Sequence, residues 1–288
     1  MTCVHLFPGQ GSQRVGMGGA ALFDRFPEQV AEADDILGFS VRELCLTDPE
    51  RRLGRTEFTQ PAVYVVGALG YATARADGLP APDAAAGHSL GEITALHTAG
   101  VLGFGDGLRL VVARARAMAR VTDGAMAAVL GMDEAVIRLL LRRAGLEAVE
   151  VANLNTADQT VVAGPAAKVE SASALLSEAG ATAVRRLDVS GPFHTSHMSA
   201  AAREFAGFLD GFPLAEPAFP VYANRTAQPY THADLPRLLA EQIDHPVLWH
   251  RTVRTLLAAD PDTEFVEIGG GTVLTRMIRA LRRERPLR

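Results

Sequence analysis

One short stretch of the sequence, GHSLGE at residues 87–92, predicts both a local fold and a chemistry. It matches the pattern G-x-S-x-G, in which a serine occupies a sharp turn between a strand and a helix, and the glycines remove Cβ atoms that would clash there. The turn lifts Ser89 clear of the backbone and places it at the N-terminus of the next helix, where free N–H groups favour negative charge. The stretch therefore predicts a serine nucleophile.

The same residues allow a purely structural interpretation. Ser89 followed by Glu92 is a capping box, which would fix the start of a helix and do nothing more. The flanking sequence favours the nucleophile, because residues 84–86 form a short apolar run and apolar residues recur at helical spacing over residues 93–101. We therefore expect a strand, a turn and a helix in that order.

Composition narrows the class of protein. The chain has 288 residues, of which 48% are hydrophobic, so it can bury a sizeable core, yet no apolar run is long enough to span a bilayer. No secretory signal is visible, and two cysteines, Cys3 and Cys45, give no disulfide framework, so we expect a cytoplasmic protein. A net charge of −5 argues against non-specific nucleic-acid binding. Neither a membrane nor a nucleic acid is an expected partner.

Glycine-rich loops near the N-terminus do not predict a nucleotide cofactor. Gly9 and Gly11 start a dinucleotide fingerprint, but Arg14 stands where the third glycine is needed. Lys168 is followed by Val169, so a phosphate-binding P-loop is excluded as well.

Strands that alternate with helices over most of the chain predict an α/β fold with a parallel sheet. Buried strands are expected at residues 3–7, 84–86 and 263–268, with a further short strand within residues 217–224. Helices are expected within residues 23–53, from Thr59 onward, and at 108–120, 234–243 and 272–283, with a break at 103–107.

Residues 124–189 have a different order of expected strands and helices from the rest of the chain. Strands are expected at residues 125–131, 149–154, 160–164 and 182–189, and helices at 133–144 and 166–180. This order, β-α-β-β-α-β, is that of the ferredoxin-like split motif. We therefore expect a large part made of residues 1–123 and 190–288, with a ferredoxin-like subdomain, 124–189, inserted into it.

A serine nucleophile needs a base, and histidine is the usual one. The chain has eight histidines, and composition alone does not choose among them. His194 and His197 could also suggest two metal ligands, but no third ligand lies close by in sequence, so no metal site is expected.

Six blocks of residues along the chain carry a family resemblance. They are LFPGQGSQ at 6–13, TQPA at 59–62, GHSLGE at 87–92, Phe193-His194, Gln242 with PVLW at 246–249, and EIG at 267–269. In this order and spacing, from residue 3 to about residue 280, the sequence resembles the malonyl-CoA:acyl-carrier-protein transacylase family. The resemblance implies an α/β-hydrolase-like parallel-sheet body with an inserted ferredoxin-like subdomain.

The resemblance also implies catalytic roles. Ser89 would be the acylated nucleophile and His194 the base that takes its proton. The backbone N–H groups of Gln10 and Leu90 would form the oxyanion hole. A backbone carbonyl, in place of an aspartate, would orient the histidine, and the matching position is Leu248.

Substrate-binding roles follow from the same resemblance. Arg114 would grip the malonyl carboxylate, since a guanidinium binds a carboxylate through two parallel hydrogen bonds. The alternative is a surface arginine in an arginine-rich chain. Gln60 and His88 would line the pocket, and the bulky ring of Phe193 would leave little room for a 2-methyl branch. One methyl group is worth only about 1–3 kcal/mol, so this preference is not absolute.

The implied reaction is transfer of malonyl from coenzyme A, through a Ser89 ester, to the phosphopantetheine thiol of an acyl carrier protein. The coenzyme A thioester is a substrate, and no cofactor is expected. The segment VYAN at 221–224 and the stand-alone length resemble discrete acyltransferases of polyketide assembly lines, which we favour over fatty-acid synthesis, acting as a monomer. Three alternatives remain: a hydrolase that clears carrier proteins, transfer of a larger acyl group between two carriers, and a catalytically silent carrier-docking protein.

Overall fold

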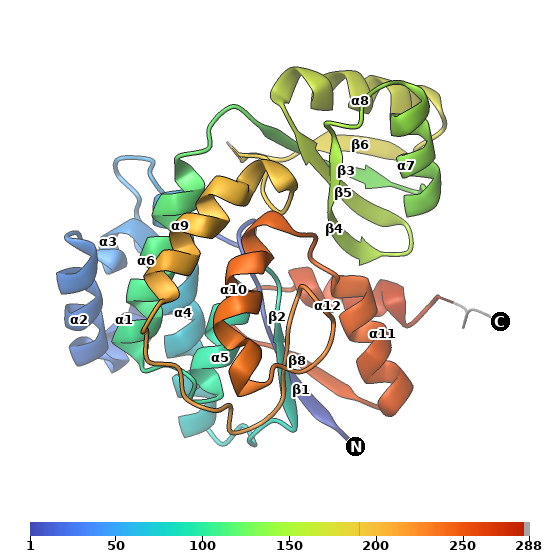
Figure 1. Cartoon of the computed structure of the whole chain (residues 1–288). Helices are drawn as coiled ribbons and strands as arrows, with labels where there is room; N and C mark the ends of the chain where they lie inside the picture. Colours follow the sequence, from blue (N-terminus) through green and yellow to red (C-terminus); the bar gives the residue numbers. More distant parts are fainter. Residues whose placement is uncertain (190, 285–288) are drawn as a thin grey trace.

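The computed structural model describes residues 1–189 and 191–284 and contains one parallel and one antiparallel sheet (Figure 1). All pairings in the first sheet are parallel, and its spatial order is β7-β2-β1-β8. Its strands are β1 (Cys3–Phe7), β2 (Ala84–Gly87), β7 (Val221–Tyr222) and β8 (Glu264–Glu267). The expected parallel α/β arrangement is therefore present, with strands at the predicted places.

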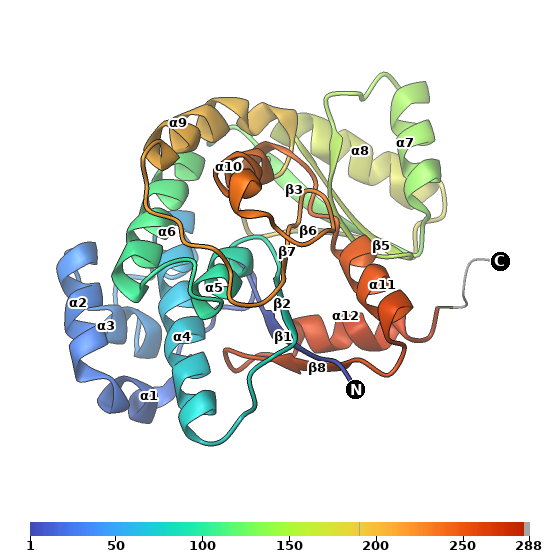
Figure 2. The same cartoon turned by 60° about the horizontal axis from the view of Figure 1, so that its bottom comes forward.

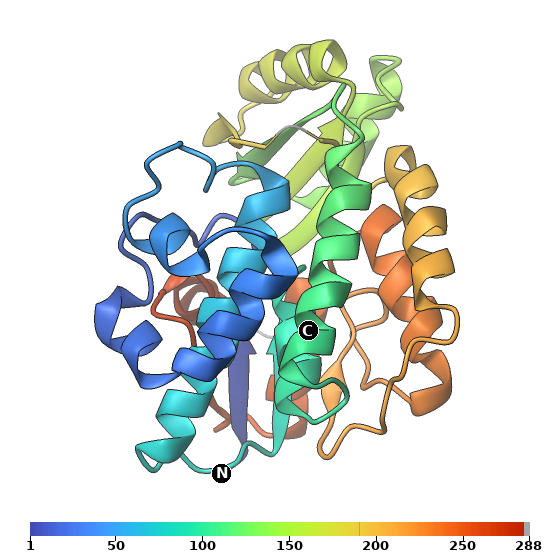
Figure 3. The same ribbon diagram turned by 90° about the vertical axis from the view of Figure 1, so that its left-hand side faces the viewer.

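Helices cover both faces of the parallel sheet (Figure 2). Successive residues of a strand point to opposite faces, so Leu6 packs with Trp249 and Leu274 on one side, and Phe7 packs with Ile93 on the other. The first side is covered by α11 (Trp249–Ala259) and α12 (Val273–Leu281). The second is covered by α4 (Thr56–Ala76), α5 (Gly91–Thr98) and α6 (Phe104–Ala119), which lie on the near side of the sheet in Figure 3. A sheet buried on both faces explains why its strands are continuous apolar runs.

The antiparallel sheet lies beside this body, and its elements follow the expected β-α-β-β-α-β order. They are β3 (Ala125–Leu130), α7 (Glu134–Arg143), β4 (Glu150–Thr156), β5 (Gln159–Gly164), α8 (Ala166–Glu178) and β6 (Ala183–Arg186). The spatial order is β4-β5-β3-β6. One face packs on α7 and α8 through Val129, Ile137 and Leu176, while Ala128 and Val161 on the other face join the core of the main body.

The remaining helices surround these two sheets. They are α1 (Gly19–Arg25), α2 (Pro27–Leu37), α3 (Val41–Leu46), α9 (Ser199–Leu209), α10 (Leu235–Asp244) and two short 3₁₀ turns, η1 (Ser196–Met198) and η2 (His232–Asp234). Within the described residues, no helix is both long enough and apolar enough to cross a membrane. Of the expected large part 190–288, residues 190 and 285–288 lie outside the described residues.

Several helix boundaries differ from the sequence predictions. The expected break at 103–107 is wrong, because α6 begins at Phe104 and contains Gly105 and Gly107. These glycines serve close packing rather than a turn: a Cβ on Gly107 would lie 2.1 Å from the Tyr64 hydroxyl. Helix α4 begins at Thr56 instead of Thr59, and the sequence reasoning gave no helix for α9 or α11.

Candidate active site

Ser89 sits between β2 and α5, so the predicted strand, turn and helix are confirmed. Its φ is +52°, a left-handed conformation that is uncommon for a residue with a side chain. The flanking glycines are sterically required. A Cβ on Gly87 would lie 1.9 Å from the backbone of Gly91, and one on Gly91 would lie 1.9 Å from the Phe7 carbonyl oxygen. The sequence therefore folds here into a tight elbow with Ser89 at its tip.

The capping-box interpretation of Ser89 and Glu92 is wrong, since α5 has no side-chain cap. The Ser89 N–H donates to Oδ1 of Asn224 at 2.7 Å, and the Asn224 amide donates in turn to the Gly87 carbonyl at 2.6 Å. The Asn224 side chain therefore holds both sides of the elbow, and the Ser89 hydroxyl is free for other partners.

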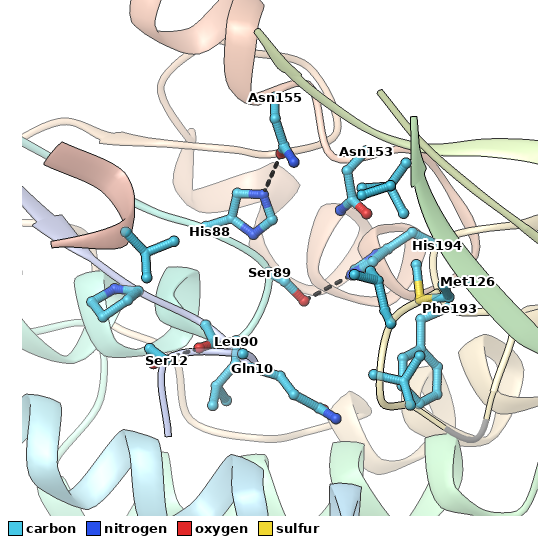
Figure 4. A pocket seen from close by; sticks show the side chains of 18 of the residues that line it. Gln10, Ser12, His88, Ser89, Leu90, Met126, Asn153, Asn155, Phe193 and His194 are labelled. Atoms are coloured by element: carbon cyan, nitrogen blue, oxygen red, sulfur yellow. Dashed lines mark hydrogen bonds between the residues drawn. The ribbon is translucent and has the colours of Figure 1, made fainter. Parts of the chain in front are cut away.

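The Ser89 hydroxyl meets His194, which is 105 residues away in sequence (Figure 4). Ser89 Oγ lies 2.7 Å from His194 Nε2, and His194 Nδ1 lies 2.7 Å from the carbonyl oxygen of Gln242. A carbonyl only accepts, so Nδ1 carries the hydrogen and Nε2 presents a lone pair to the serine hydroxyl. Burial, and then the charge of Arg114, lower the pKa of His194 to about 3. The imidazole is therefore neutral at pH 7 and able to accept a proton.

The carbonyl of Leu248 does not orient His194, contrary to the sequence prediction. Leu248 is the N-cap residue of α11, and its carbonyl accepts from the N–H and the hydroxyl of Thr252 at 2.9 and 3.1 Å. Gln242 instead lies in the last turn of α10, where helix carbonyls have no partner within the helix. The next carbonyl, that of Ile243, accepts from the His194 N–H at 3.1 Å. The end of α10 thus holds the histidine by main-chain groups.

Arg114, from α6, reaches the same hydroxyl. The side chain is buried, and its Nη2 lies 3.1 Å from Ser89 Oγ and 2.7 Å from Oε1 of Gln242. Its Nη1 donates to Oε1 of Gln60 at 2.5 Å, and Gln60 is buried on α4. Burial lowers the pKa of Arg114 to about 10, which leaves the guanidinium charged at pH 7. Arg114 is therefore not a surface arginine: a buried cation with neutral contacts faces the nucleophile.

Gln242 connects these groups, although the sequence reasoning gave it no role. Its side-chain Nε2 donates to the Ser89 carbonyl at 2.8 Å, while its Oε1 accepts from Arg114 and its main-chain carbonyl holds His194. One residue therefore sets the relative positions of nucleophile, base and cation.

A cleft of about 390 Å³ opens over Ser89, and both sheets line it. Gln10 and Leu90 line it on the side of the parallel sheet. The loop before Gln10 packs directly on the elbow, since a Cβ on Gly9 would lie 2.3 Å from the His88 carbonyl oxygen. The other walls are formed by residues from several elements, among them Met126, Ala128, Asn153, Val161, Leu187, Leu274 and Met277.

His88 and Phe193 also line this cleft, as Figure 4 shows. His88 Nε2 lies 2.8 Å from Oδ1 of Asn155 on β4, which ties the elbow to the antiparallel sheet. Phe193 is buried directly before His194. The structure thus brings together every predicted site residue except Leu248. Asn155, Asn224 and Gln242 join them, and only a known arrangement of the strands and of α10 could have placed those three amides here.

The two histidines considered as metal ligands have separate partners. His194 contacts Ser89, whereas His197 Nε2 lies 2.8 Å from the Ala148 carbonyl oxygen. Among residues 1–189 and 191–284, no group of three or more histidine, cysteine, aspartate or glutamate side chains could hold a metal ion.

Comparisons with known proteins show which family this chain resembles. A family model described as an acyl transferase domain matches residues 4–286. The chain is 42% identical to the polyketide biosynthesis malonyl CoA-acyl carrier protein transacylase PksC of Bacillus subtilis, covering 97% of each chain. It is 48% identical to the polyketide biosynthesis protein ThaF of Burkholderia thailandensis, with 96% of this chain aligned, but it spans only 24% of that protein's length.

Solved structures give the same result. A malonyl CoA-acyl carrier protein transacylase from Burkholderia pseudomallei superposes with a TM-score of 0.96 at 46% identity, covering 100% of both chains. A type II PKS acyl-carrier protein in complex with its malonyl-transacylase matches with a TM-score of 0.91 at 35% identity, covering 98% of this chain and 93% of that one. The mixed α/β fold, with a parallel sheet and a separate antiparallel sheet, is thus shared with these structures.

Proposed function

This chain belongs to the acyl transferase domain family, and from this premise we propose that it moves malonyl from coenzyme A, through an ester on Ser89, to the phosphopantetheine thiol of an acyl carrier protein. The observation that carries the proposal is the convergence on one oxygen. Ser89 Oγ lies 2.7 Å from the Nε2 of a neutral histidine and 3.1 Å from a buried guanidinium. Nucleophile, base and a cation for a carboxylate are the three parts that malonyl transfer requires.

The first half of the reaction acylates the serine. As Ser89 Oγ attacks the thioester carbonyl, His194 Nε2 takes the hydroxyl proton and passes it to the departing sulfur of coenzyme A. The N–H groups of Gln10 and Leu90 stand next to the elbow and would stabilise the negative oxygen of the tetrahedral intermediate, each worth about 10²–10³ in rate. The Gln242 carbonyl keeps the histidine in the required tautomer and stabilises the transient imidazolium.

The second half reverses these roles. The carrier thiol gives its proton to His194 and attacks the Ser89 ester, and the serine recovers its proton. The carrier assignment is supported by the relative PksC, named for acyl carrier protein and polyketide biosynthesis, and by the solved carrier complex. Polyketide biosynthesis is the pathway we propose.

Arg114 supports malonyl as the acyl group. The hydrogen bonds of this buried cation all go to neutral side chains, so no carboxylate contacts the guanidinium directly and a malonyl carboxylate can bind it. Gln60 and Gln242 hold the guanidinium in place before substrate arrives, which reduces the entropy lost on binding. An uncharged acyl group would form no charge-assisted hydrogen bond with this cation.

We further propose that residues 1–123 and 190–288 form an α/β-hydrolase-like body with 124–189 as a ferredoxin-like insert. The nucleophile elbow after β2 and the strand order of the antiparallel sheet support this division. A cytoplasmic monomer that needs no cofactor is the form we propose, and the two free thiols, Cys3 and Cys45, fit a reducing compartment.

Mass spectrometry of the intact protein tests the function. After mixing with malonyl-CoA, wild type should carry one malonyl group, which a holo carrier protein then removes as malonyl-carrier. Ser89→Ala is the matched control and should carry none. A wild type without the adduct, an adduct that persists in Ser89→Ala, or rapid release of free malonate without a carrier would each overturn the proposal.

A further inference from the structure

Glu92 is a fully buried carboxylate one turn of helix after the nucleophile. It has no exposed surface, and it accepts three hydrogen bonds. The donors are the hydroxyl of Tyr230, Nε2 of Gln242 at 2.8 Å and the backbone N–H of Asn224 at 3.1 Å. All three donors are neutral, so hydrogen bonds alone do not balance its charge. The catalytic steps above make no use of this group.

A single amide separates Glu92 from Arg114. Gln242 donates through Nε2 to Glu92 and accepts through Oε1 from Arg114 Nη2, at 2.8 and 2.7 Å. An ionised carboxylate only accepts and a guanidinium only donates, so this amide has one possible orientation between them. The two charges therefore face each other across Gln242, and each is the other's counter-charge in the free enzyme.

Other titratable groups around Glu92 are neutral at pH 7. Burial lowers the pKa of His88 and of His194, so both imidazoles are uncharged, and burial raises the pKa of Tyr230 well above its ordinary value. Among the described residues that surround Glu92, Arg114 is thus the cation that can offset its charge. Burying a second anion here without a second cation is costly.

Malonyl supplies such a second anion. In the proposed function the malonyl carboxylate binds Arg114, and two carboxylates then compete for one guanidinium. We propose that Glu92 is a charge-balancing residue: it shares the charge of Arg114 with the malonyl carboxylate, so that loading Ser89 with malonyl brings one proton from solvent onto Glu92. The inference rests on the proposed function.

The proton balance of this step is simple. Acyl transfer forms the Oγ–carbon bond and breaks the carbon–sulfur bond, and the serine proton leaves on the coenzyme A sulfur through His194. That exchange is neutral while the released thiol stays protonated. The proton on Glu92 is an additional one and comes from water or buffer.

The sign of the pH dependence follows from the site. Burial raises the pKa of Glu92 to about 7 in the free enzyme, while the hydrogen bonds and Arg114 hold it down. A bound anion that draws on Arg114 raises this pKa further. Proton uptake on loading therefore occurs above about pH 7, where the free enzyme holds Glu92 ionised. The equilibrium for malonyl loading should rise as the pH falls toward 7, by up to about tenfold per pH unit.

The test uses wild type and Glu92→Gln. The new amide can still accept from Gln242 and Asn224 through its oxygen and donate to the Tyr230 oxygen, so the charge is the main change. Mixtures of enzyme, malonyl-CoA and free coenzyme A are weighed as intact protein between about pH 6.5 and about pH 8, where the thiol stays largely protonated. The loaded-to-free ratio should fall with rising pH in wild type and stay constant in Glu92→Gln.

Infrared difference spectra of malonylated minus free wild type supply an independent readout at pH 8. On loading, a carboxylic-acid carbonyl band that shifts in heavy water should appear beside the band of the new Ser89 ester, and Glu92→Gln should show the ester band alone. Tyr230→Phe keeps the carboxylate but removes one donor, so its loading should become pH-dependent only at higher pH. The pH dependence of loading and the infrared spectrum of wild type keep the inference testable even if Glu92→Gln fails to fold.

The outcomes separate the two proposals. No malonyl on Ser89 would overturn the proposed function. Malonyl on Ser89 with a flat pH dependence in wild type and no acid band would overturn the role of Glu92 and leave the function intact. A pH slope that persists unchanged in Glu92→Gln would assign the proton to another group and would also overturn it.

Discussion

The parallel and the antiparallel sheet contribute to the cleft in different ways. The loops of the parallel sheet supply main chain packed so tightly that a Cβ on Gly9 or Gly91 would overlap a carbonyl oxygen. The antiparallel sheet supplies side chains, among them Met126, Asn155 and Val161, that form a wall of the same space. Backbone packing on the parallel side therefore fixes the turn that carries Ser89, and the side chains of the antiparallel sheet shape the room left for substrate. Substitutions on the two sides should have graded effects.

The largest effect is expected at the base. His194→Ala removes the proton acceptor of Ser89 and should lower malonyl transfer by about 10³–10⁴-fold, without loss of binding, because Arg114 and the cleft remain. Stopped-flow measurement of adduct formation on Ser89 checks this. A rate of malonyl transfer within tenfold of wild type would assign the base to another group and contradict the placement of the reacting groups given above.

Arg114→Ala comes next and concerns selectivity. Loss of a charge-assisted, two-point contact should lower kcat/KM for malonyl-CoA by about 10²-fold and leave that for acetyl-CoA within about threefold. Arg114→Lys is the control that keeps the charge but loses the planar fork. Its kcat/KM for malonyl-CoA should lie between those of wild type and Arg114→Ala. Equal losses for both substrates would mean that Arg114 supports the fold and not the malonyl group.

Two glycine substitutions test how tightly the main chain packs at the elbow. Gly91→Ala forces a Cβ against the Phe7 carbonyl and should lower the free energy of unfolding by about 1–3 kcal/mol, whereas Gly207, inside α9, has open space around it. Gly207→Ala should raise stability by about 0.5–1 kcal/mol, since alanine favours helix. Urea denaturation measures both. Similar small changes in the two variants would contradict the tight elbow.

The smallest effect is expected on the antiparallel wall. Asn155→Ala removes the partner of His88 Nε2 and should raise KM for malonyl-CoA by about threefold to tenfold with little change in kcat. Steady-state kinetics with malonyl-CoA and a holo carrier separate the two constants. A fall in kcat as large as that of His194→Ala would place Asn155 among the reacting groups and end the distinction between the two sheets.

The sequence predicts the elbow because its signal is local: two glycines flank the serine, with a short apolar run before them and a helical pattern after them. Arg114 and Gln60 come from family resemblance, since nothing in their neighbourhoods distinguishes them from other helix residues. The prediction that the Leu248 carbonyl orients His194 was wrong, because the choice of carbonyl depends on where α10 ends and α11 begins. The predicted break at residues 103–107 was wrong because Gly105 and Gly107 lie inside α6, where neighbouring side chains leave no room for a Cβ.

The amide and carboxylate network is beyond local prediction. Asn224 meets Ser89 from 135 residues away, and Tyr230 meets Glu92 from 138. Such contacts depend on the arrangement of β7 and α10 around α5, which no pattern of a few residues specifies. The motif suggests only a helix cap for Glu92. Its burial and its hydrogen-bond partners are what support the proposed counter-charge.

The main-chain carbonyl at the end of α10 has a consequence for anyone who searches this enzyme by mutation. An aspartate behind a catalytic histidine is found at once when it is replaced, but no codon change deletes a peptide oxygen. A scan of single side-chain replacements would pass over the group that aligns the imidazole and would report only what disturbs the helix around it. Replacing the peptide bond after Gln242 by an ester, which weakens its oxygen as an acceptor, would reveal it.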